Sequence, residues 1–197
     1  MKRLFFYAGI IIVIAAIWGF LPTSRDLDLS KWTKVVITDT ENIPLKIRSE
    51  LVGKVSLEAA DSGRKYDNMP GIERTKPLVG DFSKEGDSRI VYFSSGDTLV
   101  ETIIAMKLYV FGYEITKPSL PMKWAVYRAR GVFESSALDS NRTITRWTYY
   151  FHQKNRISIF FINRYINNTH RAWMKDMLAT TKAQILKAYN SQNAGSK

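Results

Sequence analysis

The sequence contains no cysteine. This absence excludes disulfides, thiolate metal sites, a cysteine nucleophile and a lipid-modified N-terminal cysteine. It leaves the redox compartment open, because a chain without cysteine suits an oxidising or a reducing one.

Other groups that carry catalysis are also scarce. The only two histidines, His152 and His170, lack the H-x-x-x-H type of spacing that binds zinc. We predict that both lie at the surface or at strand ends, and that the protein holds no metal or other cofactor. Gly80–Gly86 is followed by no G-K-[ST], so it is not a phosphate loop, and no G-x-S-x-G nucleophile motif is present. The sequence therefore indicates no reaction.

Positively charged residues outnumber negatively charged ones. The chain has 29 Lys and Arg against 18 Asp and Glu, a formal charge of +11. Such a balance favours an anionic partner. The basic residues are scattered and form no nucleic-acid-reading motif, so we predict no nucleic-acid partner. An anionic lipid surface is the partner that we expect instead.

The longest uncharged run is at the N-terminus. Leu4–Leu21 holds 18 residues without a charge, behind Lys2 and Arg3. As a helix it would be about 27 Å long, close to the thickness of a bilayer core. We predict a cytoplasmic tip and transmembrane anchor at 1–22 of an inner (plasma) membrane, with the rest of the chain periplasmic or extracellular. Secretion after signal-peptide cleavage is the alternative, although no A-x-A site ends the run.

The remainder is predicted to be one α+β domain at 32–190, between a linker at 23–31 and a flexible tail at 191–197. Alternating and β-branched segments predict strands at 32–40, 72–79, 89–94, 98–105, 108–116, 122–135 and 143–152. Helical spacing predicts short helices at 45–51 and 55–61 and a long one at 157–189, broken near Asn167–Asn168.

Several short motifs in this order carry a family resemblance. Met69-Pro70-Gly71-Ile72 is followed by a G-x-x-x-x-E-x-I hairpin from Gly96 to Ile103 and by a T-x-x-x-W strand from Thr143 to Trp147. The pattern, over roughly Lys34 to Tyr189, resembles the START-like superfamily (SRPBCC or Bet v 1-like), especially polyketide cyclase/dehydrase-type members. One departure is the lack of a tryptophan between Leu51 and Met69.

The resemblance implies a helix-grip fold, in which a curved antiparallel sheet wraps a long C-terminal helix and encloses a cavity for a hydrophobic ligand. It does not imply catalysis, because such a fold serves binders and enzymes alike. The predicted lining consists of large side chains, most with a polar tip: Tyr92, Tyr109, Tyr113, Tyr127, Trp147, Tyr149, Trp173 and Met177. A single β-bulge would turn any of these strands over.

Glu101 is the candidate catalytic residue, an acid in an apolar strand. Facing the cavity, it could act as an acid or base. Facing outward, or paired with Arg89 or Arg130, it would be structural.

We therefore favour a membrane-anchored, non-catalytic binder of a lipid or other hydrophobic molecule. The alternatives are a cyclase- or hydratase-type enzyme that uses Glu101 or a cavity tyrosine, and a tethered protein-interaction module with a filled core and an exposed apolar patch.

Overall fold

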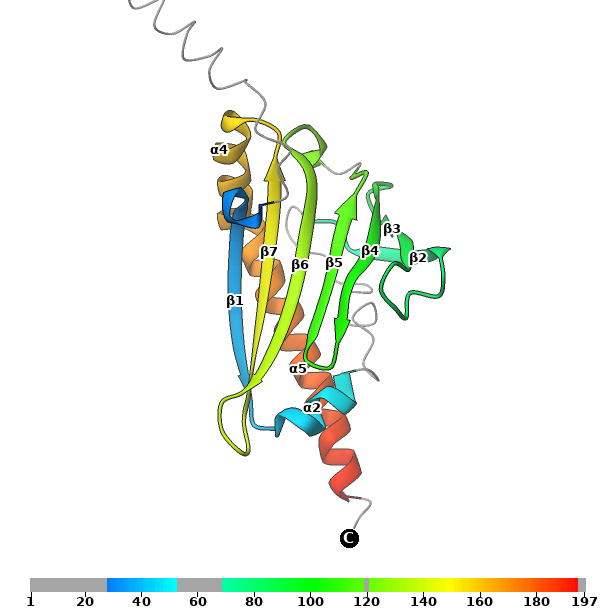
Figure 1. Ribbon diagram of the computed structural model, residues 1–197, viewed down its shortest axis with the longest axis vertical. Coiled ribbons are helices and arrows are strands. Elements are labelled where there is room, and N and C mark those ends of the chain that lie inside the picture. The colour runs from blue at the N-terminus through cyan, green and yellow to red at the C-terminus, as the bar shows by residue number, and fades with distance from the viewer. Residues whose placement is uncertain (1–27, 53–68, 119–120, 195–197) are drawn as a thin grey trace, which may run out of the picture.

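Seven antiparallel strands and a long C-terminal helix make up most of the residues that the structure describes (Figure 1). The computed structural model describes residues 28–52, 69–118 and 121–194. The strands are β1 (Thr33–Glu41), β2 (Ile72–Val79), β3 (Ser88–Phe93), β4 (Thr98–Lys107), β5 (Val110–Thr116), β6 (Val126–Ala137) and β7 (Thr143–Gln153). Their order in the sheet is β1-β7-β6-β5-β4-β3-β2. The predicted α+β class is confirmed.

Six helical elements in these described ranges lie before, between and after the strands. They are the 3-10 turns η1 (Leu29–Lys31) and η2 (Pro121–Trp124), the helices α2 (Leu45–Val52), α4 (Arg156–Tyr165) and α5 (Arg171–Ala194), and the π-helical turn η3 (Ile166–His170). The helix was predicted to break near Asn167–Asn168, and η3 lies at that place. Asn155 caps α4 by accepting a hydrogen bond from the Ser158 backbone N–H at 2.8 Å.

The alternation in β7 explains how the sheet holds its core. Its inward residues are buried: Thr143, Thr145, Trp147, Tyr149 and Phe151. Helix α5 packs against this face with a buried stripe of Met174, Met177, Leu178, Thr181 and Ile185. Register shifts in β2, β4 and β6 mark bulges, which bend a sheet and allow it to curve around a helix.

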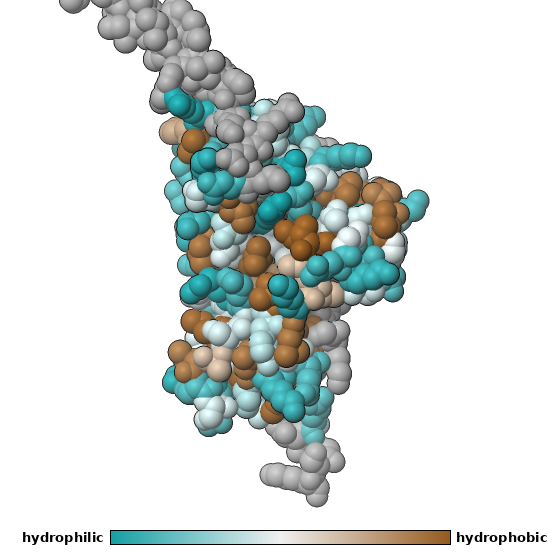
Figure 2. All heavy atoms as spheres, in the orientation of Figure 1, coloured by the Kyte–Doolittle hydropathy of each residue, from teal (hydrophilic) through white to brown (hydrophobic). Residues whose placement is uncertain are grey.

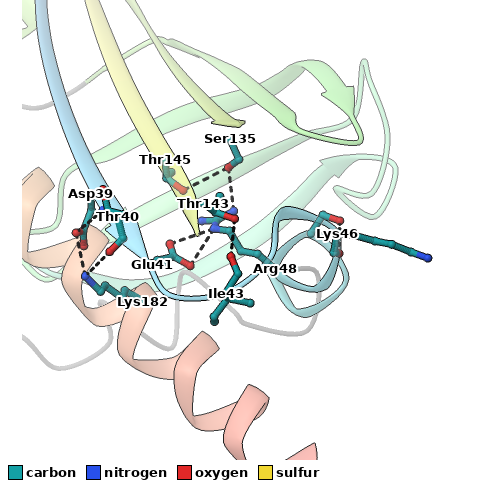
Figure 3. Close-up of polar contacts among 11 residues, drawn as sticks. Asp39, Thr40, Glu41, Ile43, Lys46, Arg48, Ser135, Thr143, Thr145 and Lys182 are labelled. Atoms are coloured by element: carbon teal, nitrogen blue, oxygen red, sulfur yellow. Dashed lines mark hydrogen bonds and ion pairs between the residues drawn. The ribbon is translucent and has the colours of Figure 1, made fainter. Parts of the chain in front are cut away.

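Polar contacts fix α2 and α5 to the end of β1 (Figure 3). The Arg48 guanidinium of α2 bonds the buried Glu41 carboxylate at 3.0 Å and the Ser135 hydroxyl at 3.0 Å. From α5, the Lys182 ammonium contacts Asp39 at 3.0 Å and the Thr40 carbonyl at 2.7 Å. These contacts hold the lower end of the fold, away from α4.

Two predicted boundaries require correction. Helix α5 continues to Ala194, whereas a tail was predicted from 191. Residues 171–194 contain no glycine or proline that would end the helix earlier, and the Ser191 hydroxyl bonds the Lys187 carbonyl at 2.9 Å. The end of the predicted linker is ordered as η1, since the Asp28 side chain accepts a bond from the Ser30 backbone N–H.

The predicted anchor at 1–22 and the predicted helix at 55–61 lie outside the described residues. Among the helices that the described ranges contain, none has the length and apolar character needed to cross a bilayer.

Candidate ligand cavity

A cavity of about 200 Å³ lies between the sheet and the helices η3 and α5. Its walls come from β3 to β7, from η3 and from the segment at 69–70, and most of them are apolar, including Val91, Phe93, Leu99, Ile115, Val126 and Phe151. A second cavity of about 70 Å³ adjoins it, lined by Phe111, Phe133, Trp147, Met177 and others. Ile72, Glu101, Tyr113 and Trp173 line both. The interaction-module alternative expected a filled core, and these two cavities show that the interior is not filled.

The other face of the sheet has a different composition. Figure 2 shows a mosaic of hydrophilic and hydrophobic residues in the orientation of Figure 1. Glu114 of β5 bonds Arg130 at 2.7 Å and Arg128 at 3.2 Å there. These cross-strand ion pairs take up charge on the face away from α5, whereas the cavity side is apolar.

Tyr113 is placed in the cavity wall by a glycine on the next strand. Tyr113, Gly131 and Tyr149 are register partners across β5, β6 and β7. A Cβ at position 131 would lie 2.3 Å from the Tyr113 ring carbon Cζ, so the ring occupies the space that any other side chain would fill. The Tyr113 and Tyr149 rings meet edge to face with centroids 6.3 Å apart.

Both phenols stay protonated. Burial raises the pKa of Tyr113 well above its usual value, and the nearby Glu101 charge raises it further. Burial likewise raises the pKa of Tyr149 well above 10, and that of Tyr165 to about 12. These hydroxyls are therefore neutral hydrogen-bonding groups, and none of them is a ready base.

The sequence left open whether Glu101 faces the cavity or pairs with an arginine, and in the structure it does both. It faces inward and lines both cavities, and it also pairs with Arg89, its partner across the β3–β4 ladder. The Arg89 Nε and Nη2 atoms lie 2.8 and 2.7 Å from Glu101 Oε2. Arg130, the other predicted partner, bonds Glu114 instead. Glu101 thus adds a charged, paired group at the junction of the two cavities.

His170 is buried, and the prediction of a surface position was wrong. Only 2% of it is exposed, because η3 turns it inward. The rings of Tyr149, Phe151, Tyr165 and Trp173 surround the imidazole with centroids 4.5 to 5.4 Å away. Neither ring nitrogen has a hydrogen-bond partner among the described residues.

Burial sets the protonation state of His170. It lowers the pKa of the imidazole to about 3, so the ring is neutral near pH 7. A neutral imidazole has one N–H donor and one nitrogen lone pair. His170 thus presents a donor and an acceptor in the wall of an apolar cavity, with neither used by the part of the chain that the structure describes.

His152 lies at the end of strand β7, as predicted, but it is buried there and not at the surface. It is 3% exposed and stacks on Trp32 with centroids 4.5 Å apart, so η1 and the start of β1 cover it. The described residues contain no group of three or more His, Asp or Glu that could hold a metal.

The predicted lining residues divide into two groups. Tyr113, Trp147, Tyr149, Trp173 and Met177 line one or both cavities. Tyr92, Tyr109 and Tyr127 do not.

The positions of these three tyrosines outside the cavities follow from strand alternation and strand boundaries. Tyr92 alternates with the inward Val91 and Phe93, and it stacks under the Arg74 guanidinium at 3.7 Å. Tyr109 falls in the turn before β5, which begins only at Val110, and is 36% exposed. Tyr127 follows the inward Val126 and its ring contacts His152 instead.

Sequence reasoning missed the side chains that the helical turn contributes. Tyr165, Thr169 and His170 line the larger cavity from the end of α4 and from η3. The Tyr165 hydroxyl lies 3.7 Å from the sulfur of Met69 across the cavity rim. The signal for them was present in the spacing of buried residues through the helix.

No protein-family model matches the sequence, and no curated protein matches it. Solved structures do. Norcoclaurine synthase from Thalictrum flavum, in complex with dopamine and hydroxybenzaldehyde, is similar with a TM-score of 0.59 and 10% identity, over 85% of this chain and 95% of that one.

Two further solved structures are similar to this chain. The major latex-like protein 151 from Panax ginseng matches with a TM-score of 0.54 and 12% identity, over 79% of this chain and 98% of that one. The Zhui aromatase/cyclase from Streptomyces sp. R1128 matches with a TM-score of 0.53 and 15% identity, over 78% of this chain and 96% of that one. At such identities the likeness concerns the fold. The chain has the Bet v 1-like helix-grip fold, a seven-stranded antiparallel sheet with its long C-terminal helix across one face.

Proposed function

We propose that this protein binds a small, uncharged hydrophobic molecule with one polar group, such as a hydroxyl, in the cavity between its sheet and η3–α5. The observation that carries the proposal is His170. A buried polar group without a partner costs about 1–3 kcal/mol, so native structures rarely keep one without a use. A ligand hydroxyl could accept a hydrogen bond from the imidazole N–H or donate one to the other ring nitrogen.

The size of the cavity limits the ligand. An engineered apolar cavity of about 150 Å³ binds benzene, and drug-sized pockets begin at about 300 Å³. At about 200 Å³, the larger cavity suits one substituted ring or a short branched chain rather than a complete membrane lipid. The dopamine and hydroxybenzaldehyde bound to norcoclaurine synthase are single-ring phenols, which supports this size class.

The membrane anchor predicted at 1–22 remains part of the proposal. Leu4–Leu21 and the charge of +11 support a protein held at an anionic bilayer, in the inner (plasma) membrane with its domain outside the cytoplasm. Hydrophobic molecules concentrate in bilayers, so a tethered binder would take up its ligand without the ligand crossing bulk water.

An enzyme of cyclase or hydratase type is the second candidate, supported by the position of Glu101 in both cavity walls. Two observations favour binding over catalysis. The Glu101 carboxylate is bonded to Arg89, and the cavity phenols are held in their protonated form.

A matched pair of probes tests the binding proposal. The full chain in mild detergent is titrated with p-cresol and with p-xylene, which differ only by a hydroxyl in place of a methyl, while tryptophan fluorescence is recorded. The wild type should prefer p-cresol by roughly 2- to 10-fold, the contribution of one net hydrogen bond. His170→Phe should abolish the preference, and Tyr127→Phe, outside both cavities, should retain it. Equal affinity of the wild type for the two probes, or no binding of either, would overturn the proposal.

A further inference from the structure

Three aromatic side chains are exposed at the end of the molecule where β7 finishes and α4 begins. Trp124 of η2 is 49% exposed, and Phe160 and Phe161 of α4 are 66% and 41% exposed. The Trp124 and Phe161 rings meet edge to face at 4.9 Å, and Phe160 adjoins Phe161 at 5.4 Å. We call these three residues the aromatic end patch.

The patch is held outward by defined structure. Helix α4 buries Ser158 and Ile162 against the fold, which leaves Phe160 on the opposite side. Lys154 joins the two elements, because its ammonium bonds the Lys123 carbonyl at 2.7 Å and its backbone N–H bonds the Ala125 carbonyl at 2.8 Å. The exposed aromatics therefore form one surface across η2 and α4.

The chain segment that carries Phe160 and Phe161 has charges of one sign only. Residues 153–175 contain five basic residues and no Asp or Glu: Lys154, Arg156, Arg164, Arg171 and Lys175. Arg156, Phe160 and Arg164 are exposed and spaced by four, so they share one face of α4. A helix face that combines aromatic and basic residues is typical of peptides that lie in the headgroup layer of anionic membranes.

The N-terminal chain enters the fold at this same end. Figure 1 shows η1 at the start of β1, at the end of the molecule where α4 lies, and β1 contacts α4. The Gln153 amide at the end of β7 donates to the Lys31 carbonyl at 2.8 Å, and its oxygen accepts from the Thr33 backbone N–H at 3.3 Å. Only six residues, 22–27, lie between Leu21, the end of the apolar run, and Asp28. Fully extended, the seven steps from Leu21 to Asp28 would span roughly 25 Å, which keeps this end close to wherever the run is inserted.

We infer that the aromatic end patch docks on the headgroup layer of an anionic bilayer, with Phe160 and Trp124 inserted among the lipids and Arg156 and Arg164 on the phosphates. Val126, Phe151 and Tyr165 line the larger cavity from the same end of the fold. Docking in this orientation directs the cavity, rather than the α2 end, toward the bilayer. The inference rests on the proposed anchor and not on the proposed ligand, so the p-cresol titration succeeds or fails separately.

The absence of cysteine makes the test direct, because a single introduced cysteine carries the label. Full-length Phe160→Cys and Leu138→Cys chains, each with a nitroxide, are reconstituted in phosphatidylcholine vesicles with and without phosphatidylglycerol. Leu138 is a matched control, since it is 48% exposed in the β6–β7 turn at the opposite end. The label at 160 should become accessible to oxygen and shielded from an aqueous nickel reagent in the anionic vesicles, and the label at 138 should not.

Charge removal checks the orientation. Arg156→Gln and Arg164→Gln should each lower the ratio of docked to undocked chains by about fivefold, and neutral vesicles should lower it as well. Equal water accessibility at 160 and 138 in anionic vesicles would overturn the inference. So would protection of 160 that is indifferent to lipid charge and rises with protein-to-lipid ratio, which would indicate a second copy of the chain on the patch.

Discussion

Acidification should destabilise the fold through His170. The imidazole has a pKa of about 3 in the folded protein against about 6.5 in the unfolded chain. Between these values the unfolded chain binds the proton and the folded protein does not, so the free energy of unfolding falls as the pH falls below 6.5. The slope approaches about 1.4 kcal/mol per pH unit, which amounts to about 2 kcal/mol between pH 7.5 and pH 5.

Chemical denaturation of the detergent-solubilised full chain, followed by tryptophan fluorescence across this pH range, measures the effect. The comparison is with His170→Phe, which keeps a ring in the aromatic surroundings and removes the titrating group. The pH dependence of its unfolding free energy should be about 2 kcal/mol smaller over the same interval. The variant should also be more stable at pH 7.5, because no unpartnered nitrogen remains buried.

Tyr165→Phe serves as the control. Tyr165 packs against the same imidazole at 5.4 Å, and its pKa of about 12 keeps it from titrating between pH 5 and 7.5. It should therefore retain the pH dependence of the wild type. Identical pH profiles for the wild type and His170→Phe would refute the reasoning, since the histidine would then carry the same proton occupancy folded and unfolded.

Three substitutions test the packing of the cavity wall and of the α2 end of the fold, each by denaturant unfolding. Gly131→Ala should cost about 1–3 kcal/mol, because the new Cβ meets the Tyr113 ring, and in a Tyr113→Val background it should be neutral or stabilising. Arg48→Met leaves the Glu41 carboxylate buried alone and should cost about 3–5 kcal/mol, much of it recovered by adding Glu41→Leu. Lys182→Met breaks a half-exposed ion pair and should cost less than about 1 kcal/mol.

Periodicity predicted the seven strands and the long C-terminal helix of this fold. In β7 the β-branched and aromatic residues predict the strand, and every second residue from Thr143 to Phe151 is buried in it. The helix break was also predictable, because Asn167 and Asn168 interrupt the apolar pattern. These are local signals, and each depends on neighbours within one or two turns of chain.

Which tyrosines face the cavity was not predictable, because that depends on strand boundaries and bulges. Tyr127 lies within a register shift between Val126 and Arg128, and Tyr109 lies one residue before its strand starts. The burial of the two histidines was not predictable for another reason. The burial of His152 depends on Trp32, 120 positions away in the chain, and no local pattern indicates such a contact.

The burial of His170 follows from the geometry of one helical turn. From Ser158 to Leu178 every fourth side chain is buried, namely Ser158, Ile162, Ile166, His170, Met174 and Leu178, and the adjoining Thr169 and Met177 are buried with them. In a regular α-helix each such step drifts by about 40°, which would carry the stripe about halfway round the helix over five steps. The π-turn at Ile166–His170, closed by the Arg171 N–H on the Ile166 carbonyl, absorbs one extra residue and reduces that drift by about half. A spacing of four held over so many positions is therefore itself a sequence signal for a π-turn. The π-turn thus sets the rotation between α4, which carries Phe160 and Arg164 on its exposed side, and the His170 ring in the cavity wall, so the geometry that relates the aromatic end patch to the cavity depends on a single five-residue segment.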